Sequence, residues 1–275
     1  MLIKPFAAYV MRGRWEAYSL AFIFSLMPFL GWLGIAIAAL VTLRKGAKEG
    51  LMIFLVTAIP AIIYLLLGRT LPLYSSVFGG ALIVYILALT LRRTGSWPIV
   101  IQTATLIAII AVFCAHLFIP KLIEYWTITI SNYFNEAESL TNLSLPANDI
   151  QTLTYYLARF ATGIIAMWFM WVNLINLCIA RWFQAELYNP KGLGPELLNI
   201  RLGWLANILL IVIAAATLLK LTPSWDYIPI IIGMFFAAGL SLVHAWISQS
   251  KFMIFLYILF YGLLVLEARF IIPLT

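Results

Sequence analysis

The sequence predicts an all-α, polytopic transmembrane helix bundle with about seven full spans and an N-terminal two-part helical hairpin. Hydrophobic residues make up 64% of its 275 residues and only 10% are charged, whereas a water-soluble domain has about 25% charged residues. The mean hydropathy of the chain is +1.04. Apolar runs of near span length, about 20 residues, recur along the chain. We therefore expect a single integral membrane domain over residues 1–275.

The first apolar run, residues 17–43, contains no charged residue. Its 27 residues exceed the roughly 20 that one straight span needs. Pro28 lies near its middle and can end a helix, because proline lacks the N–H and clashes with the preceding turn. We predict a hairpin of two short helices over residues 15–43, turning near residues 27–32. The alternative is a single long span.

The distribution of lysine and arginine favours the hairpin, because cytoplasmic loops carry an excess of these residues. With a hairpin, twelve of the 17 cations lie on the inner side and four on the outer side. A single span gives nine and seven, whichever end is inside. The inner cations are Lys4, Arg12, Arg14, Arg44, Lys45, Lys48, Arg92, Arg93, Arg181, Lys191, Arg201 and Lys251, and the outer ones Arg69, Lys121, Lys220 and Arg269. We predict a multi-pass protein of the bacterial inner (cytoplasmic) membrane.

The remaining elements follow from the apolar runs and the polar stretches between them. Residues 1–14 predict a short basic amphipathic lead-in. Residues 121–150 form the outer polar segment, which predicts an outer amphipathic helix and then an irregular stretch. Arg181 predicts the inner end of the longest span, and turn residues predict an inner loop over residues 184–202. The full spans are predicted at residues 51–67, 71–91, 98–119, 152–179, 203–221, 227–247 and 252–272.

Four polar residues within predicted spans are candidate ligand-binding residues. Arg159 and Asn173 are 14 positions apart and point in nearly the same direction on one helix, with Asn176 about one turn further. A buried arginine costs at least ~2.5 kcal/mol at bilayer depth, so Arg159 needs a partner or a wet cavity, or else it reaches the outer surface. The two asparagines bind a ligand or hydrogen-bond between helices. His116 is a proton or ligand site, or a packing residue.

Small residues repeat every four positions on two predicted helices, and such rows let helix backbones approach closely in lipid. Gly233, Ala237 and Ser241 predict an internal helix contact. A second row at the start of the hairpin predicts either helix packing or docking of a partner protein. Its members are Ala17, Ala21 and Ser25.

The sequence contains no Gly-rich phosphate loop, no CxxC and no HExxH, which are motifs of nucleotide and metal sites. Cys114 and Cys178 lie in apolar runs and predict buried thiols. We expect no metal, no cofactor and no enzymatic activity. Lipid head groups account for the net charge of +7, so we expect no nucleic-acid partner.

The N-terminal third resembles the YybS-like family of uncharacterised bacterial membrane proteins. The resemblance rests on VMRGRWEA and on MPFLGWLGIAIAALVTLRKGAKEGL, followed by a proline-containing span, and is best over residues 7–67. That family is distantly similar to the S components of energy-coupling-factor transporters. This implies a substrate-binding membrane fold, with the Ala17 and Ala21 row docking to a coupling subunit. S components have about six helices, which is fewer than the number predicted from the sequence of this chain.

We expect a transporter-like subunit that binds a small solute from the outer side within the lipid bilayer, with or without a membrane protein partner. The alternative is a non-catalytic membrane scaffold or partner-binding factor in envelope assembly. A polar cavity open to the outer face distinguishes the first function from the second.

Overall fold

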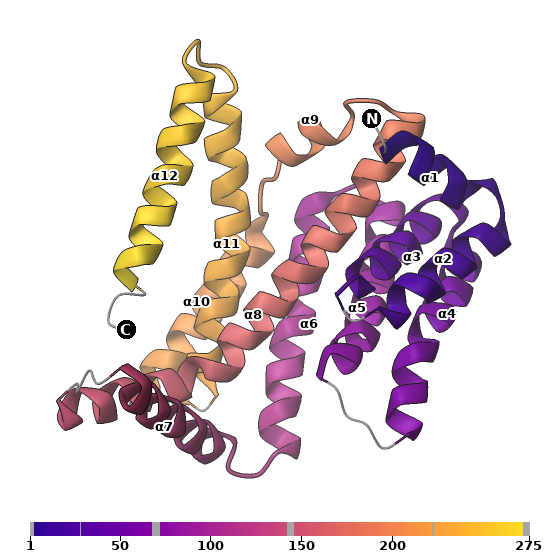
Figure 1. Cartoon of the computed structure of the whole chain (residues 1–275). Helices are drawn as coiled ribbons and strands as arrows, with labels where there is room; N and C mark the ends of the chain where they lie inside the picture. The colour runs from indigo at the N-terminus through magenta and orange to yellow at the C-terminus, as the bar shows by residue number, and fades with distance from the viewer. Residues whose placement is uncertain (1–2, 28, 68–71, 142–145, 222, 272–275) are drawn as a thin grey trace.

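The computed structural model describes residues 3–27, 29–67, 72–141, 146–221 and 223–271 and confirms the all-α class. Within these residues the chain forms twelve helices and no strand. The helices are α1 (Ile3–Arg12), α2 (Arg14–Leu26), α3 (Gly31–Lys45), α4 (Ala47–Leu66), α5 (Pro72–Thr94), α6 (Trp97–Phe118), α7 (Leu122–Thr141), α8 (Ala147–Tyr188), α9 (Leu193–Leu198), α10 (Trp204–Leu218), α11 (Ser224–Ile247) and α12 (Met253–Ile271). Figure 1 shows α8 running through the middle of the bundle, with α1–α5 on one side and α10–α12 on the other.

Five helices in the described part of the chain are long and apolar enough to cross a membrane, namely α4, α5, α6, α8 and α11. The other two predicted spans coincide with α10 and α12, whose described apolar segments are shorter. A multi-pass arrangement therefore follows from helix length and composition.

Residues 14–45 form a hairpin of two helices, as the sequence predicts. The first helix, α2, ends at Leu26 and the second, α3, begins at Gly31. Between them, the N–H of Leu30 donates to the carbonyl of Met27 at 3.0 Å. Pro28, the residue on which the prediction rested, lies outside the described residues.

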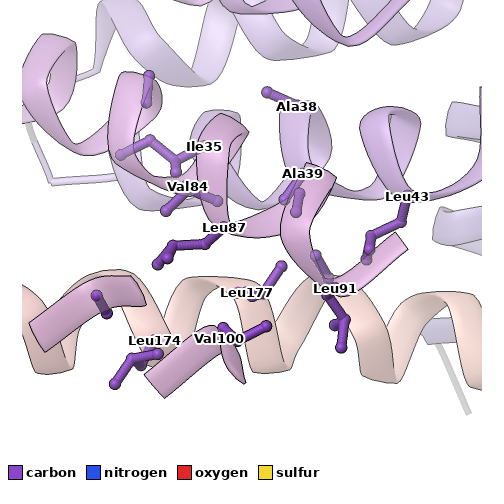
Figure 2. Packing of buried hydrophobic residues seen from close by; sticks show 14 of the residues in the cluster. Ile35, Ala38, Ala39, Leu43, Val84, Leu87, Leu91, Val100, Leu174 and Leu177 are labelled. Carbon is purple, nitrogen blue, oxygen red and sulfur yellow. The ribbon is translucent and has the colours of Figure 1, made fainter. Parts of the chain in front are cut away.

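The second helix of the hairpin is enclosed by protein. Eleven of the 15 residues of α3 are buried, because α2, α4, α5 and α8 all pack against it. Figure 2 shows Ile35 of α3 close to Val84 of α5, with Leu177 of α8 below them in the view. Lipid tails are as apolar as these side chains, so close packing favours this contact more than water exclusion does.

The longest helix corrects the prediction for the inner loop. The predicted span ends before Arg181, but α8 continues to Tyr188 and has 42 residues. At 1.5 Å per residue it is about 60 Å long, roughly twice the thickness of a bilayer core. Charged residues such as Arg181 end an apolar run, but they do not end a helix. The helix α8 ends just before Pro190, because proline cannot continue a helix. The rest of the predicted loop contains the short helix α9.

The helix α7 lies across the end of the bundle opposite α9 (Figure 1). It occupies the first part of the polar segment at residues 121–150. Its Trp126 indole N–H donates to the hydroxyl of Thr162 on α8 at 2.9 Å, while Tyr125 and Tyr133 are exposed. This two-sided character agrees with the predicted amphipathic helix. Residues 142–145, in the predicted irregular stretch, lie outside the described residues.

Candidate functional site

A cavity of about 430 Å³ lies between α6, α8, α9 and α11. It is at the end of the bundle where α5 meets α6, the end that the cation distribution predicts to be cytoplasmic. Its lining is mostly apolar and includes Trp97, Trp171, Cys178, Leu197 and Ala237. A Cβ atom added to Gly194, which also lines the cavity, would meet nothing within 4 Å. The helix α9 therefore forms one wall of the cavity.

Two further polar side chains of the lining, Ser241 and His244, already have hydrogen-bond partners within the protein. The Ser241 hydroxyl accepts the backbone N–H of Ile200 at 3.1 Å. His244 Nδ1 lies 2.7 Å from the carbonyl of Leu240, so this nitrogen carries the proton. The hydroxyl of Tyr261 then donates to Nε2 at 2.8 Å. The cavity thus offers a bound molecule mainly apolar surface.

A polar pocket of about 200 Å³ adjoins this cavity. Glu196 of α9 accepts the indole N–H of Trp97 at 3.2 Å and the Nε–H of Arg181 at 3.0 Å. Its other oxygen accepts from Arg181 Nη2, and Arg181 Nη1 donates to Gln184 at 3.0 Å. Arg92 also lines the pocket. From the sequence alone, Arg92 is predicted only as an inner-side cation and Arg181 only as the inner end of the longest span.

A second polar group lies at the opposite end of the same helices. His116 Nε2 on α6 is 2.6 Å from Asp226 Oδ2 on α11. The other carboxylate oxygen accepts the backbone N–H of Gly163 on α8 at 2.9 Å. The side-chain exposures are 17% for His116 and 3% for Asp226. A Cβ atom at Gly163 would overlap the carbonyl of Asp226, so glycine allows this close approach of α8 and α11.

Sequence reasoning singled out His116 but missed Asp226. The signal was present, since Asp226 is an acidic residue next to a long apolar run, and a carboxylate at membrane depth needs a partner. His116, Asp226 and the Gly163 N–H come from three helices, α6, α11 and α8. Local sequence spacing does not encode this arrangement.

Arg159 is half-buried near this second group. Its guanidinium lies 4.6 Å from the ring centre of Tyr155 and 5.9 Å from that of Trp225, which precedes Asp226. No carboxylate of the described residues lies within 4.0 Å of Arg159. Two of the four predicted ligand-binding residues, Arg159 and His116, are therefore at the same end of the α8–α11 contact.

The other two candidates, Asn173 and Asn176, are buried further along α8 and do not line the cavity. Asn173 Nδ2 donates to the carbonyl of Phe169 at 2.7 Å, and its oxygen has no hydrogen-bond partner among the described residues. A Cβ atom at Gly80 of α5 would lie 3.1 Å from that oxygen. Asn173 thus faces a close contact with α5 and is separate from both polar groups.

The residues of the two small-residue rows are buried within the protein. Ala17, Ala21 and Ser25 are buried, and a Cβ atom at Gly34 of α3 would lie 2.9 Å from the carbonyl of Ala21. This row therefore packs within the hairpin.

In the second row Gly233 packs closely against α8, since a Cβ atom there would lie 2.8 Å from the side chain of Met167. Ala237 and Ser241 instead line the cavity. The described residues include no group of three or more His, Cys, Asp or Glu side chains that could hold a metal ion.

Comparisons with protein-family models, curated proteins and solved structures gave no match to this chain.

Proposed function

We propose that this chain is a transporter-like subunit of the bacterial inner membrane that binds a small, mainly apolar molecule and does not transform it. The observation that supports this proposal is the cavity between α6, α8, α9 and α11. It differs from the polar cavity at the outer face that the sequence led us to expect, because its lining is mostly apolar and it lies at the predicted inner end. Its volume of about 430 Å³ falls within the roughly 300–1,000 Å³ of small-molecule sites. Its apolar lining with few polar groups is also typical of such sites.

The helices around the cavity favour a binding function over a purely structural one. Four helices contribute to its lining, and α9 supplies Gly194, Leu197 and Leu198. Concave, mostly apolar surfaces between helices are typical of small-molecule sites. In the S components that the N-terminal third resembles, a row of small residues docks to a coupling subunit. In this chain that row is buried in the hairpin, so a coupling partner would need another surface.

Native mass spectrometry of the gently purified protein tests this proposal. A small molecule should co-purify with the wild-type chain and be lost from Ala237→Phe, whose larger side chain enters the cavity. The matched control is Ala238→Phe, one residue further along α11, because Ala238 is not part of the lining. Both variants need melting temperatures that show a folded protein. An empty wild-type protein, or equal retention by both variants, would favour the scaffold function.

A further inference from the structure

We propose that the molecule bound in this cavity is an amphiphile with one apolar chain and an anionic head group, either a carboxylate or a phosphate. This inference rests on the proposed function, because it assigns the chemistry of the ligand of that same cavity. The apolar chain occupies the cavity, and the head group occupies the adjoining polar pocket beside Arg92 and Arg181.

The charges of the polar pocket call for an anion. Its lining contains two guanidinium groups, Arg92 and Arg181, and one carboxylate, Glu196. Glu196 is already paired with Arg181. No carboxylate of the described residues lies within 4.0 Å of Arg92, whose Nη1 donates to the backbone carbonyl of Leu43 at 2.6 Å. Arg92 is exposed, so its guanidinium is solvated and accessible, and the pocket lining has an excess of one positive charge.

The remaining N–H groups of Arg92 suit an anionic head group. Guanidinium groups bind carboxylates and phosphates through two parallel hydrogen bonds, and this geometry favours them over neutral head groups. Basic pockets between transmembrane helices at the cytoplasmic side are a known form of acidic head-group site. The pocket lies at the end of the bundle that the cation distribution predicts to be cytoplasmic.

The linings of the two spaces contact each other through one hydrogen bond. Trp97 lines the apolar cavity, and its indole N–H donates to Glu196, which lines the polar pocket. Gly95 leaves further room on the polar side, because a Cβ atom there would meet nothing within 4 Å. A molecule whose chain lies against Trp97 therefore has its head group beside the arginines.

Protection of Cys178 from alkylation tests this inference, since its thiol lines the cavity. The protein carries Cys114→Ala and is held in nanodiscs of phosphatidylcholine, and the rate of its reaction with N-ethylmaleimide is measured. The probes are myristate, tetradecanol, tetradecyltrimethylammonium and inorganic phosphate. Myristate should protect at about a tenth of the concentration of tetradecanol or less, because a hydrogen bond to a charged group is worth at least a factor of ten. The cationic probe should protect least.

Variants of Arg92 locate the head group. Arg92→Gln should abolish the advantage of myristate over tetradecanol and leave tetradecanol protection unchanged. Arg92→Lys keeps the charge without the planar fork and should give an intermediate result. The matched control is Arg93→Gln, because Arg93 is the next residue and does not line the pocket. Unchanged myristate protection in Arg92→Gln would overturn the assignment of the head group.

The probes separate failure of this inference from failure of the proposed function. If none of the three chain-bearing probes protects Cys178, the cavity is not a binding site and both proposals fail. If tetradecanol protects as well as myristate, the cavity binds apolar molecules, and only the assignment of an anionic head group is contradicted. If inorganic phosphate alone protects as well as myristate, the pocket is a site for free anions and the amphiphile is wrong.

Discussion

Arg14 and Glu49 form an ion pair in which Arg14 Nη2 lies 2.5 Å from Glu49 Oε1, although 35 positions separate the two residues. The hydroxyl of Tyr18 also donates to the second oxygen of Glu49 at 3.3 Å. Arg14 precedes the first apolar run and Glu49 follows it. Both ends of that run therefore lie at the same end of the bundle, which excludes a single straight span over residues 17–43.

Single cysteines at positions 12 and 48 should label from the same side of the membrane, in a background with both native cysteines replaced. Because inner loops favour lysine and arginine, we expect a membrane-impermeant maleimide to label neither site in intact cells and both in inverted vesicles. Labelling of one site alone in intact cells would contradict the hairpin. Labelling of both sites from outside would reverse its orientation.

The hairpin could be predicted because the bilayer imposes a length on each apolar run. A run of 27 uncharged residues with Pro28 near its middle is too long for one straight span, and the cations at its two ends favour the same side. The extent of α8 could not be predicted in this way. Its final turns contain Arg181 and Glu186, which end the apolar signal although the helix continues.

Replacing Gly34 with alanine should destabilise the hairpin. The added Cβ would lie close to the Ser25 hydroxyl and 2.9 Å from the backbone carbonyl of Ala21, and overpacking of this kind costs about 1–3 kcal/mol. The control is Gly239→Ala on α11, where a Cβ meets nothing within 4 Å. That change should gain up to ~1 kcal/mol, because alanine favours a helix more than glycine. Unfolding free energies in mixed micelles measure both, and equal effects would contradict the close contact.

The pair of His116 and Asp226 should couple strongly in a double-mutant cycle. Removing His116 by substitution with alanine leaves a buried carboxylate with backbone N–H partners alone, and breaking a buried pair costs about 3–5 kcal/mol. The control is Lys121→Ala, which breaks the exposed pair of Lys121 with Glu124 and should cost less than ~1 kcal/mol. Additive effects of His116→Ala and Asp226→Ala on the unfolding free energy would contradict the coupling.

Arg159 should affect stability more than ligand binding. Its guanidinium lies against Tyr155 and Trp225, at the end of the bundle opposite the cavity. Arg159→Ala should lower the unfolding free energy by about 0.5–2 kcal/mol, the range of a cation–π contact, and Arg159→Lys should lower it less. Neither change should alter myristate protection of Cys178. Loss of that protection in a folded Arg159→Ala protein would contradict this and would show that Arg159 contributes to ligand binding.

The candidate site was less predictable than the fold. Arg159 and His116 could be selected because charged and titratable residues at membrane depth are rare and need partners. Their actual neighbours, Trp225 and Asp226, depend on how α6, α8 and α11 pack. The cavity depends on α9, which has only six residues within a stretch predicted as a loop. A helix this short has too few residues to show a hydrophobic period, so this wall of the cavity could not be predicted.

The enclosure of α3 has a consequence for biosynthesis. Helical hairpins shorter than the bilayer need protein around them, because lipid satisfies no free backbone groups. The last wall around α3 is α8, which begins only at Ala147. The ribosome therefore releases the hairpin long before its final surroundings exist. We therefore expect α2 and α3 to lack one wall of their protein surroundings until α8 is made, so that a chain truncated before α8 leaves one face of α3 uncovered.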